Sequence, residues 1–191
     1  YNDIYELSQV TGSQSHTYDY DLVGNREEAD SITYTPNDLN QYADVDSITF
    51  DYDDNGNLED DGTNTYVYDE ENRLVSWTDG TDNASYTYDA LNRRVSKTVN
   101  SVTTYFVYDG DDIIAEYTSG GSLLAENIFG DSVDELLAMT RGGNTYYYHY
   151  DGLGSVSDVT NSSGTVVENY TYDPYGAPSV TTSSINNRYR F

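Results

Sequence analysis

The sequence predicts an all-β protein, a meander of repeated β-hairpins. An aromatic-x-aromatic-Asp motif recurs along the chain, a turn-forming segment rich in Gly and Asn follows each motif, and short strands with period-2 alternation lie between the turns. Tyr accounts for 22 of the 191 residues, against four Phe and one Trp. The predicted core therefore consists of amphipathic rings that keep a hydroxyl near water or a hydrogen-bond partner.

The motif occurs in seven full copies. Their aromatic pairs are Tyr18/Tyr20, Phe50/Tyr52, Tyr66/Tyr68, Tyr86/Tyr88, Phe106/Tyr108, Tyr148/Tyr150 and Tyr170/Tyr172, and Asp follows each of them. Two weaker copies, Tyr34–Asn37 and Asn127–Gly130, fill the gaps, so the second aromatic or its substitute recurs every 16 to 22 residues. A repeat of this length fits two strands with two turns and is too short for a pair of helices.

Each motif is followed by a turn and then by a strand. Asp54–Leu58 and Ala90–Arg94 contain the Gly or Asn that tight turns with positive φ demand. Alternation resumes in Arg94–Val99, and a second polar turn such as Asp79–Asn83 ends the unit. Only Asp134–Met139 would tolerate a helix.

The two aromatics of each motif lie on one face of a strand, because residues i and i+2 point the same way. The middle residue faces the opposite side. We expect the second aromatics to occupy equivalent positions in stacked hairpins and to carry the repeat. They are Tyr20, Tyr52, Tyr68, Tyr88, Tyr108, Tyr150 and Tyr172.

The charge is strongly acidic, with 34 Asp and Glu against eight Lys and Arg, a formal net charge of −26 and a pI of about 4.1. This excludes nucleic-acid binding, which needs a basic patch, and argues against an anionic membrane surface. No stretch approaches the roughly 20 apolar residues of a membrane span, so no membrane insertion is expected. The chain has no Cys and therefore no disulfide or thiolate metal site.

These motifs resemble the Rhs/YD-repeat family, whose unit reads Tyr-x-Tyr-Asp followed by Gly-Asn-Arg or an Asn-Arg equivalent. The resemblance extends from about Tyr18 to Gly176. Residues 105–176 resemble the Rhs-associated core segment near the end of the repeat array, above all in Tyr147–Val156 and Tyr172–Gly176. The resemblance predicts three parts: β-hairpin repeats in 1–104, core-like repeats in 105–176, and an irregular segment in 177–191 that continues into further chain.

The resemblance implies a β-sheet ribbon that spirals into a hollow shell. In toxin members the shell encloses a C-terminal toxic segment, and in animal relatives it is a cell-surface adhesion module. The self-cleavage region and variable toxin of the toxin members have no counterpart in this sequence. Asp173-Pro174 is similar to the acid-proline pairs near that region but lies upstream of it, so we expect a turn there.

One segment is similar to a calcium loop. Asp51, Asp53 and Asn55, followed by Gly56, match its first half, where alternate oxygen ligands wrap the ion. The twelfth position is Gly62 and not the bidentate Glu. An acidic hairpin explains the same residues, so calcium is the alternative and no other cofactor is expected.

No catalytic residues are predicted. His16 and His149 are the only imidazoles and are best explained as strand residues, and Gly152-Leu153-Gly154-Ser155 lacks the context of a phosphate loop. Three Asn-x-Ser/Thr sequences are candidate glycosylation sites on exposed turns, at Asn83, Asn161 and Asn169.

Two functions follow from different classes. The favoured one is a non-catalytic extracellular scaffold, a wall segment of a shell that encapsulates a secreted effector or toxin. The alternative is a cell-surface adhesion module or extracellular filament, in which Tyr rows stack on carbohydrate. The expected partners are further repeats of the same chain or neighbouring subunits, with an enclosed toxin segment or surface glycans.

Overall fold

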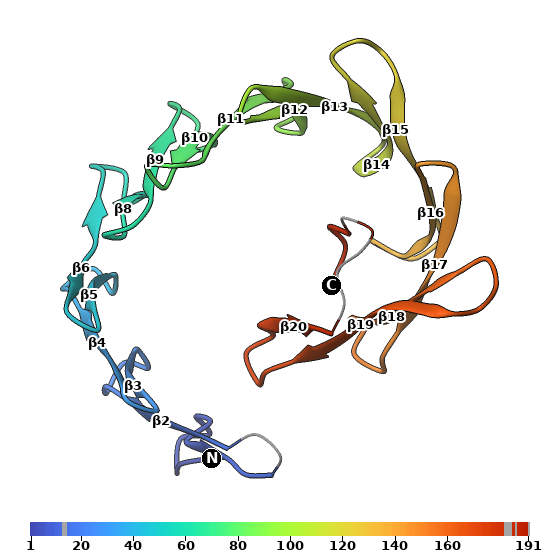
Figure 1. Cartoon of the computed structure of the whole chain (residues 1–191). Coiled ribbons are helices and arrows are strands. Elements are labelled where there is room, and N and C mark those ends of the chain that lie inside the picture. Colours follow the sequence, from blue (N-terminus) through green and yellow to red (C-terminus); the bar gives the residue numbers. More distant parts are fainter. Residues whose placement is uncertain (13–14, 182–184, 186, 191) are drawn as a thin grey trace. The chain divides into compact units, whose positions relative to one another are not determined.

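The structure, a computed structural model, describes residues 1–12, 15–181, 185 and 187–190 (Figure 1). Its regular elements are all antiparallel strands, which confirms the all-β prediction. Within these residues there is no helix, and therefore no helix that is long and apolar enough to cross a membrane. The stretch that would have tolerated a helix enters strand β16 instead.

The strands form two compact units, Tyr1–Ser85 and Tyr86–Phe191. The strands of unit 1 are β1 (Gln9–Val10), β2 (His16–Tyr20), β3 (Arg26–Ala29), β4 (Ile32–Pro36), β5 (Tyr42–Val45), β6 (Ile48–Thr49), β7 (Asp51–Tyr52), β8 (Leu58–Asp60), β9 (Thr65–Tyr68) and β10 (Leu74–Thr78). The boundary falls within β11 (Asn83–Tyr88). The strands of unit 2 are β12 (Arg94–Val99), β13 (Val102–Asp109), β14 (Asp112–Thr118), β15 (Leu123–Phe129), β16 (Leu136–Arg141), β17 (Asn144–Tyr150), β18 (Val156–Asn161), β19 (Val166–Tyr172) and β20 (Pro178–Val180).

Neighbouring strands follow the order of the sequence, from β1 to β6 in one sheet and from β7 to β20 in the other. Within each sheet every strand therefore pairs with the strands next to it in the chain, which is the predicted meander. The predicted part boundary at 104/105 rests on the family resemblance and stays a prediction.

The two faces of the ribbon differ as the alternation requires. The middle residue of every full motif is exposed: Asp19, Asp51, Val67, Thr87, Val107, His149 and Thr171. The first aromatic is buried in four motifs, at Tyr18, Phe106, Tyr148 and Tyr170. We call the face of unit 2 that carries Phe106, Tyr148 and Tyr170 the aromatic face.

The larger core belongs to unit 2. Buried residues of β15 to β19 form it together with Ile185, namely Ala125, Leu136, Met139, Tyr148, Val156, Val159 and Tyr170. Its side chains come from one strand after another and from the end of the chain. A single hairpin would be marginal alone, so this stacking supplies the stability of the array.

Candidate functional site

The Asp that follows the aromatic pair caps a tight turn in six of the seven full motifs. At Asp89 the backbone N–H donates to the carbonyl of Arg93 at 2.9 Å, and the N–H of Asn92 donates to the carbonyl of Asp89 at 3.1 Å. The Asp89 Oδ1 accepts the N–H groups of Leu91 and Arg93, each at 2.9 Å. Its Oδ2 accepts the Arg93 Nε at 2.8 Å. One carboxylate thus satisfies most of the polar groups of the turn.

The same pattern recurs along the chain. It is present at Asp21, Asn37, Asp53, Asp69, Asp151, Asn161 and Asp173. The third residue after the capping residue has positive φ in every copy: Gly24, Asn40, Gly56, Asn72, Asn92, Gly154, Gly164 and Gly176. Gly and Asn tolerate this left-handed conformation best, which explains why the repeat carries one of them there.

The turn's hydrogen bonds lower the pKa of four capping carboxylates, those of Asp21, Asp53, Asp69 and Asp89. Hydrogen bonds from the Asn57 side chain and from the turn's backbone lower the pKa of Asp53 below its ordinary value. The backbone N–H of Arg93 is the largest cause of the lowered pKa of Asp89. Accepting hydrogen bonds favours the charged form of a carboxylate.

This turn occupies the residues of the predicted calcium loop. Asp53 Oδ1 accepts the N–H groups of Asn55 and Asn57 at 2.9 and 2.8 Å, and its Oδ2 accepts the Asn57 amide at 2.8 Å. Asp51 is exposed in β7. In 1–12, 15–181, 185 and 187–190, no three His, Asp or Glu side chains gather as metal ligands would.

In five motifs the second Tyr links its hairpin to an earlier part of the chain. The Tyr108 hydroxyl donates to the carbonyl of Arg94 at 2.9 Å, and the Tyr150 hydroxyl donates to the carbonyl of Leu136 at 2.8 Å. The hydroxyls of Tyr20, Tyr52 and Tyr172 do the same with the carbonyls of Leu7, Tyr42 and Val156. Tyr68 and Tyr88, like these five, are half-buried. The recurring Tyr is therefore a hydrogen-bond latch as well as a packing residue.

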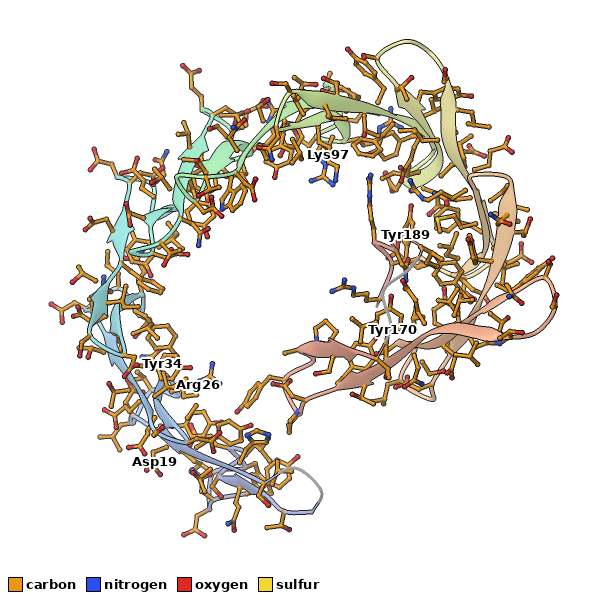
Figure 2. The ribbon with its side chains drawn as sticks, viewed as in Figure 1. Asp19, Arg26, Tyr34, Lys97, Tyr170 and Tyr189 are labelled. Carbon is orange, nitrogen blue, oxygen red and sulfur yellow. The ribbon has the colours of Figure 1, made fainter. Side chains whose placement is uncertain are left out.

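An irregular segment lies on the aromatic face of unit 2. We call Ile185 together with residues 187–190 the C-terminal segment. The Tyr189 ring meets the rings of Phe129 and Tyr148 edge-on, at centroid distances of 6.0 and 6.4 Å. The Arg190 carbonyl accepts the backbone N–H of Val156 at 2.9 Å. Figure 2 shows Tyr170 and Tyr189 close together on this face.

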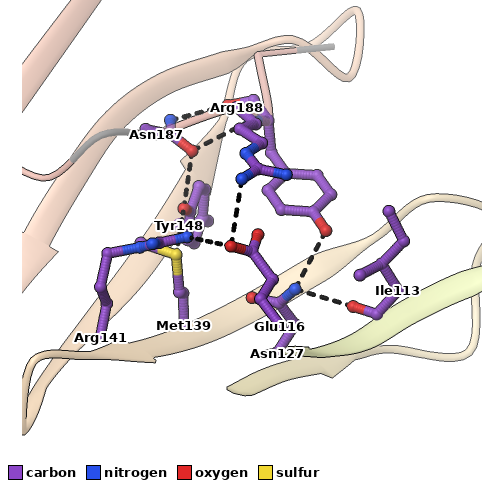
Figure 3. A network of polar contacts seen from close by, with 9 residues as sticks. Ile113, Glu116, Asn127, Met139, Arg141, Tyr148, Asn187 and Arg188 are labelled. Carbon is purple, nitrogen blue, oxygen red and sulfur yellow. Dashed lines mark hydrogen bonds and ion pairs between the residues drawn. The ribbon is translucent and has the colours of Figure 1, made fainter. Parts of the chain in front are cut away.

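Asn187 anchors the segment (Figure 3). Its Oδ1 accepts the Tyr148 hydroxyl at 2.8 Å, and its Nδ2 donates to the Tyr170 hydroxyl at 3.0 Å. Asn127 adds a second link by donating to the Tyr189 hydroxyl at 3.0 Å. Burial raises the pKa of Tyr148 above its ordinary value, so this phenol stays a donor.

Two carboxylates are buried under the segment. Glu116 is 1% exposed, and its Oε2 accepts Arg141 Nη2 at 2.8 Å and Arg188 Nη2 at 3.2 Å. Glu168 is fully buried and accepts the Tyr170 hydroxyl and the Ile185 N–H. Burial and the hydrogen bond to Glu168 raise the pKa of Tyr170 to about 12. Pairing of this kind is what makes buried charge tolerable.

The sequence missed Asn187, Arg188 and Tyr189. Their contacts with Tyr148, Asn127 and Glu116 join residues 39 to 72 positions apart, which no local pattern indicates. One signal was available: two of the eight cationic residues stand in Arg188-Tyr189-Arg190, beside an aromatic ring, in a chain that is otherwise acidic.

The remaining predicted residues lie in strands or turns. His16 pairs with Asp30 at 2.9 Å, and His149 contacts the Thr160 hydroxyl at 2.9 Å, so each imidazole is a strand residue. Of the candidate glycosylation sites, Asn83 is exposed at the start of β11, Asn161 caps a turn and Asn169 lies within β19. The Asn169 amide donates to Asp158 at 2.9 Å.

Comparison with known proteins places these features in context. A family model described as Teneurin YD-shell matches residues 1–187. Over 96 residues the chain is 35% identical to the tRNA3(Ser)-specific nuclease WapA of Bacillus spizizenii, a match that covers 48% of this chain and 4% of that protein. A solved TcdB2–TccC3 structure without its hypervariable C-terminal region matches 93% of this chain and 11% of that chain, at a TM-score of 0.55 and 16% identity, and shows the fold alone. The chain thus spans a small part of each relative's length.

Proposed function

The chain belongs to the Teneurin YD-shell family, and from that membership we propose that it is a wall segment of a YD-repeat shell that encloses a secreted effector or toxin outside the cell. In this role the chain is a scaffold. Its capping carboxylates accept the hydrogen bonds of the turns. Any enzymatic activity would reside in the enclosed effector or toxin.

One observation carries the proposal: the aromatic face of unit 2 binds the C-terminal segment, largely through side chains. Ile185 is buried in the core, Asn187 is held by Tyr148 and Tyr170, and Tyr189 packs between aromatic rings. Phenol hydroxyls and buried amides offer donors and acceptors to any backbone laid across them. A face of this kind suits the interior of a container for unfolded or partly folded chain.

Matched cysteine variants in β13 test the proposal, and residues 1–191 contain no other Cys. Val102 lies on the aromatic face and is 70% exposed, whereas Val107 lies on the opposite face and is 43% exposed. Val102→Cys and Val107→Cys are compared in the full-length protein, with a maleimide coupled to a large polymer and with a small maleimide. Both side chains are exposed in residues 1–191, so a difference in modification between the two positions shows which face the full-length protein shields from the reagent.

A closed shell predicts that the large reagent modifies the Cys at 107 and leaves the Cys at 102 unmodified until the protein is unfolded. Equal modification of the two sites by the large reagent would reject the container. That result would favour the alternative, an adhesion module or filament whose aromatic face is open to solvent and surface glycans.

A further inference from the structure

Half of the cationic side chains of this acidic protein gather at one place. The chain has eight Lys and Arg, and four of them, Arg94, Lys97, Arg141 and Arg188, act on one another electrostatically around Glu116. All lie in unit 2, on or against the aromatic face (Figure 2 labels Lys97). Such a concentration of like charge is costly unless an anion balances it.

The strand register explains how the cluster is assembled. Phe106, Glu116, Ala125 and Arg141 stand opposite one another in a row across β13 to β16. Since Ala125 is small, Arg141 reaches across it to Glu116 (Figure 3). Lys97 stands opposite Thr104 in the adjacent pair of strands.

The guanidinium groups flank one ring. Arg94 and Arg188 place their Cζ atoms 5.5 and 5.1 Å from the centroid of Phe106. Arg188 belongs to the C-terminal segment, whereas Arg94 lies in β12. The cluster is thus built from both the sheet and the segment that covers it.

The one carboxylate in the cluster does not balance it. A single oxygen of Glu116 accepts both Arg141 and Arg188, so the cluster keeps an excess of positive charge. No ion pair of Lys97 or Arg94 occurs among the residues that the structure describes. Burial, followed by the neighbouring arginines, lowers the pKa of Lys97 below its ordinary value.

Several buried donors also lack an acceptor. Within the described part of the chain, no hydrogen bond reaches the Nε atoms of Arg94, Arg141 and Arg188 or the Nη1 atom of Arg188. Buried donors are normally satisfied, and the guanidinium fork matches the oxygens of carboxylate and phosphate. Two of these arginines, Arg141 and Arg188, line a cavity of about 490 Å³ together with Lys97, Thr104 and Glu116.

We propose that this cavity is a binding site for an oxyanion, which Lys97 and the two arginines at Glu116 hold against the hydroxyl of Thr104. Phosphate and carboxylate share this chemistry, and the anion could be free in solution or belong to an acidic peptide. The site does not depend on the shell, because its residues all come from unit 2.

The test measures acylation of Lys97, the single lysine of the sequence, by peptide mass spectrometry on the full chain. The probes are inorganic phosphate, a short Glu-rich peptide, and chloride at matched ionic strength. Phosphate or the peptide should slow acylation saturably, by about tenfold or more, since an anion in the site covers the amine and favours its protonated form. Chloride should leave the rate unchanged.

Arg188→Gln should remove the protection, and Arg190→Gln, two residues along the same segment, should keep it. For Lys97→Met, the binding of phosphate and of the peptide is measured by calorimetry. Because Met keeps the aliphatic stem of Lys, this variant removes the charge of the site without displacing the C-terminal segment. Protection by phosphate identifies a free anion, and protection by the peptide alone identifies a carboxylate. The proposed site would be overturned if chloride gave the same protection of Lys97, or if the protection persisted in Arg188→Gln. It would also be overturned if neither phosphate nor the peptide protected Lys97 in a folded chain.

Discussion

Replacing Tyr150 by Phe tests the hydroxyl latch that defines the repeat. The second aromatic is Tyr in all seven full motifs, whereas the first is Phe in two of them, at Phe50 and Phe106. Packing alone does not explain this difference, because Phe fills the same space. The structure explains it, since the Tyr150 hydroxyl donates to the carbonyl of Leu136 at 2.8 Å.

The expected loss follows from the hydrogen bond and its surroundings. A typical intramolecular hydrogen bond contributes about 0.5–1.5 kcal/mol, and a buried acceptor left without its donor costs about 1–3 kcal/mol. Leu136 is fully buried, so water cannot easily replace the hydroxyl. We expect Tyr150→Phe to lower the free energy of unfolding by roughly 1–2 kcal/mol.

Urea unfolding of the full chain, followed by tyrosine fluorescence and by native-state hydrogen exchange of β16, measures the loss. Hydrogen exchange is needed because a repeat array does not have to unfold in one step. Tyr147→Phe is the control, since Tyr147 is 44% exposed on the opposite face. It should change the free energy by less than about 0.5 kcal/mol. Equal effects of the two variants would refute the latch.

Three further predictions concern the turns and the C-terminal segment. Gly154→Ala should lower the free energy of unfolding by roughly 1–2 kcal/mol in thermal unfolding, because φ is +88° at this residue. Gly152→Ala, where φ is not positive, should be near neutral. No atom crowds the added Cβ at either position, so equal effects of the two variants would contradict the backbone argument. The lowered pKa values of Asp21, Asp53, Asp69 and Asp89 stabilise the fold above about pH 4, and this contribution should be lost as the pH falls through the folded-state values; a urea midpoint that is flat across that range would be inconsistent. Asn187→Ala should release the C-terminal segment and speed tryptic cleavage after Arg188. Replacing Asn144, which is exposed, by Ala should leave the cleavage rate unchanged. An unchanged rate in Asn187→Ala would show that Asn187 is not the anchor.

Sequence reasoning succeeded where the determinants are local. The alternation of Tyr with exposed residues such as Val107 and His149 fixes which face each side chain takes. In six of the seven full motifs the Gly or Asn three residues after the Asp marks a turn that requires positive φ, so these hairpins could be predicted one by one.

The same reasoning failed where contacts depend on distant residues. It predicted that the second aromatics carry the repeat, but it did not indicate that the first is the more deeply buried of the two in motifs such as Tyr148/Tyr150 and Tyr170/Tyr172. The hydroxyl of Tyr150 reaches a carbonyl 14 residues earlier, and the register between hairpins that brings them together is a tertiary property. Residues 177–191 were expected to be irregular, but no local pattern indicated that Arg188 would meet Glu116.

Electron cryomicroscopy of the full-length protein tests the central claim most directly. The account predicts a closed YD-repeat shell in which the face carrying Phe106, Tyr148 and Tyr170 points inward and further polypeptide fills the interior. A filament or an open ribbon with that face in contact with solvent would contradict it.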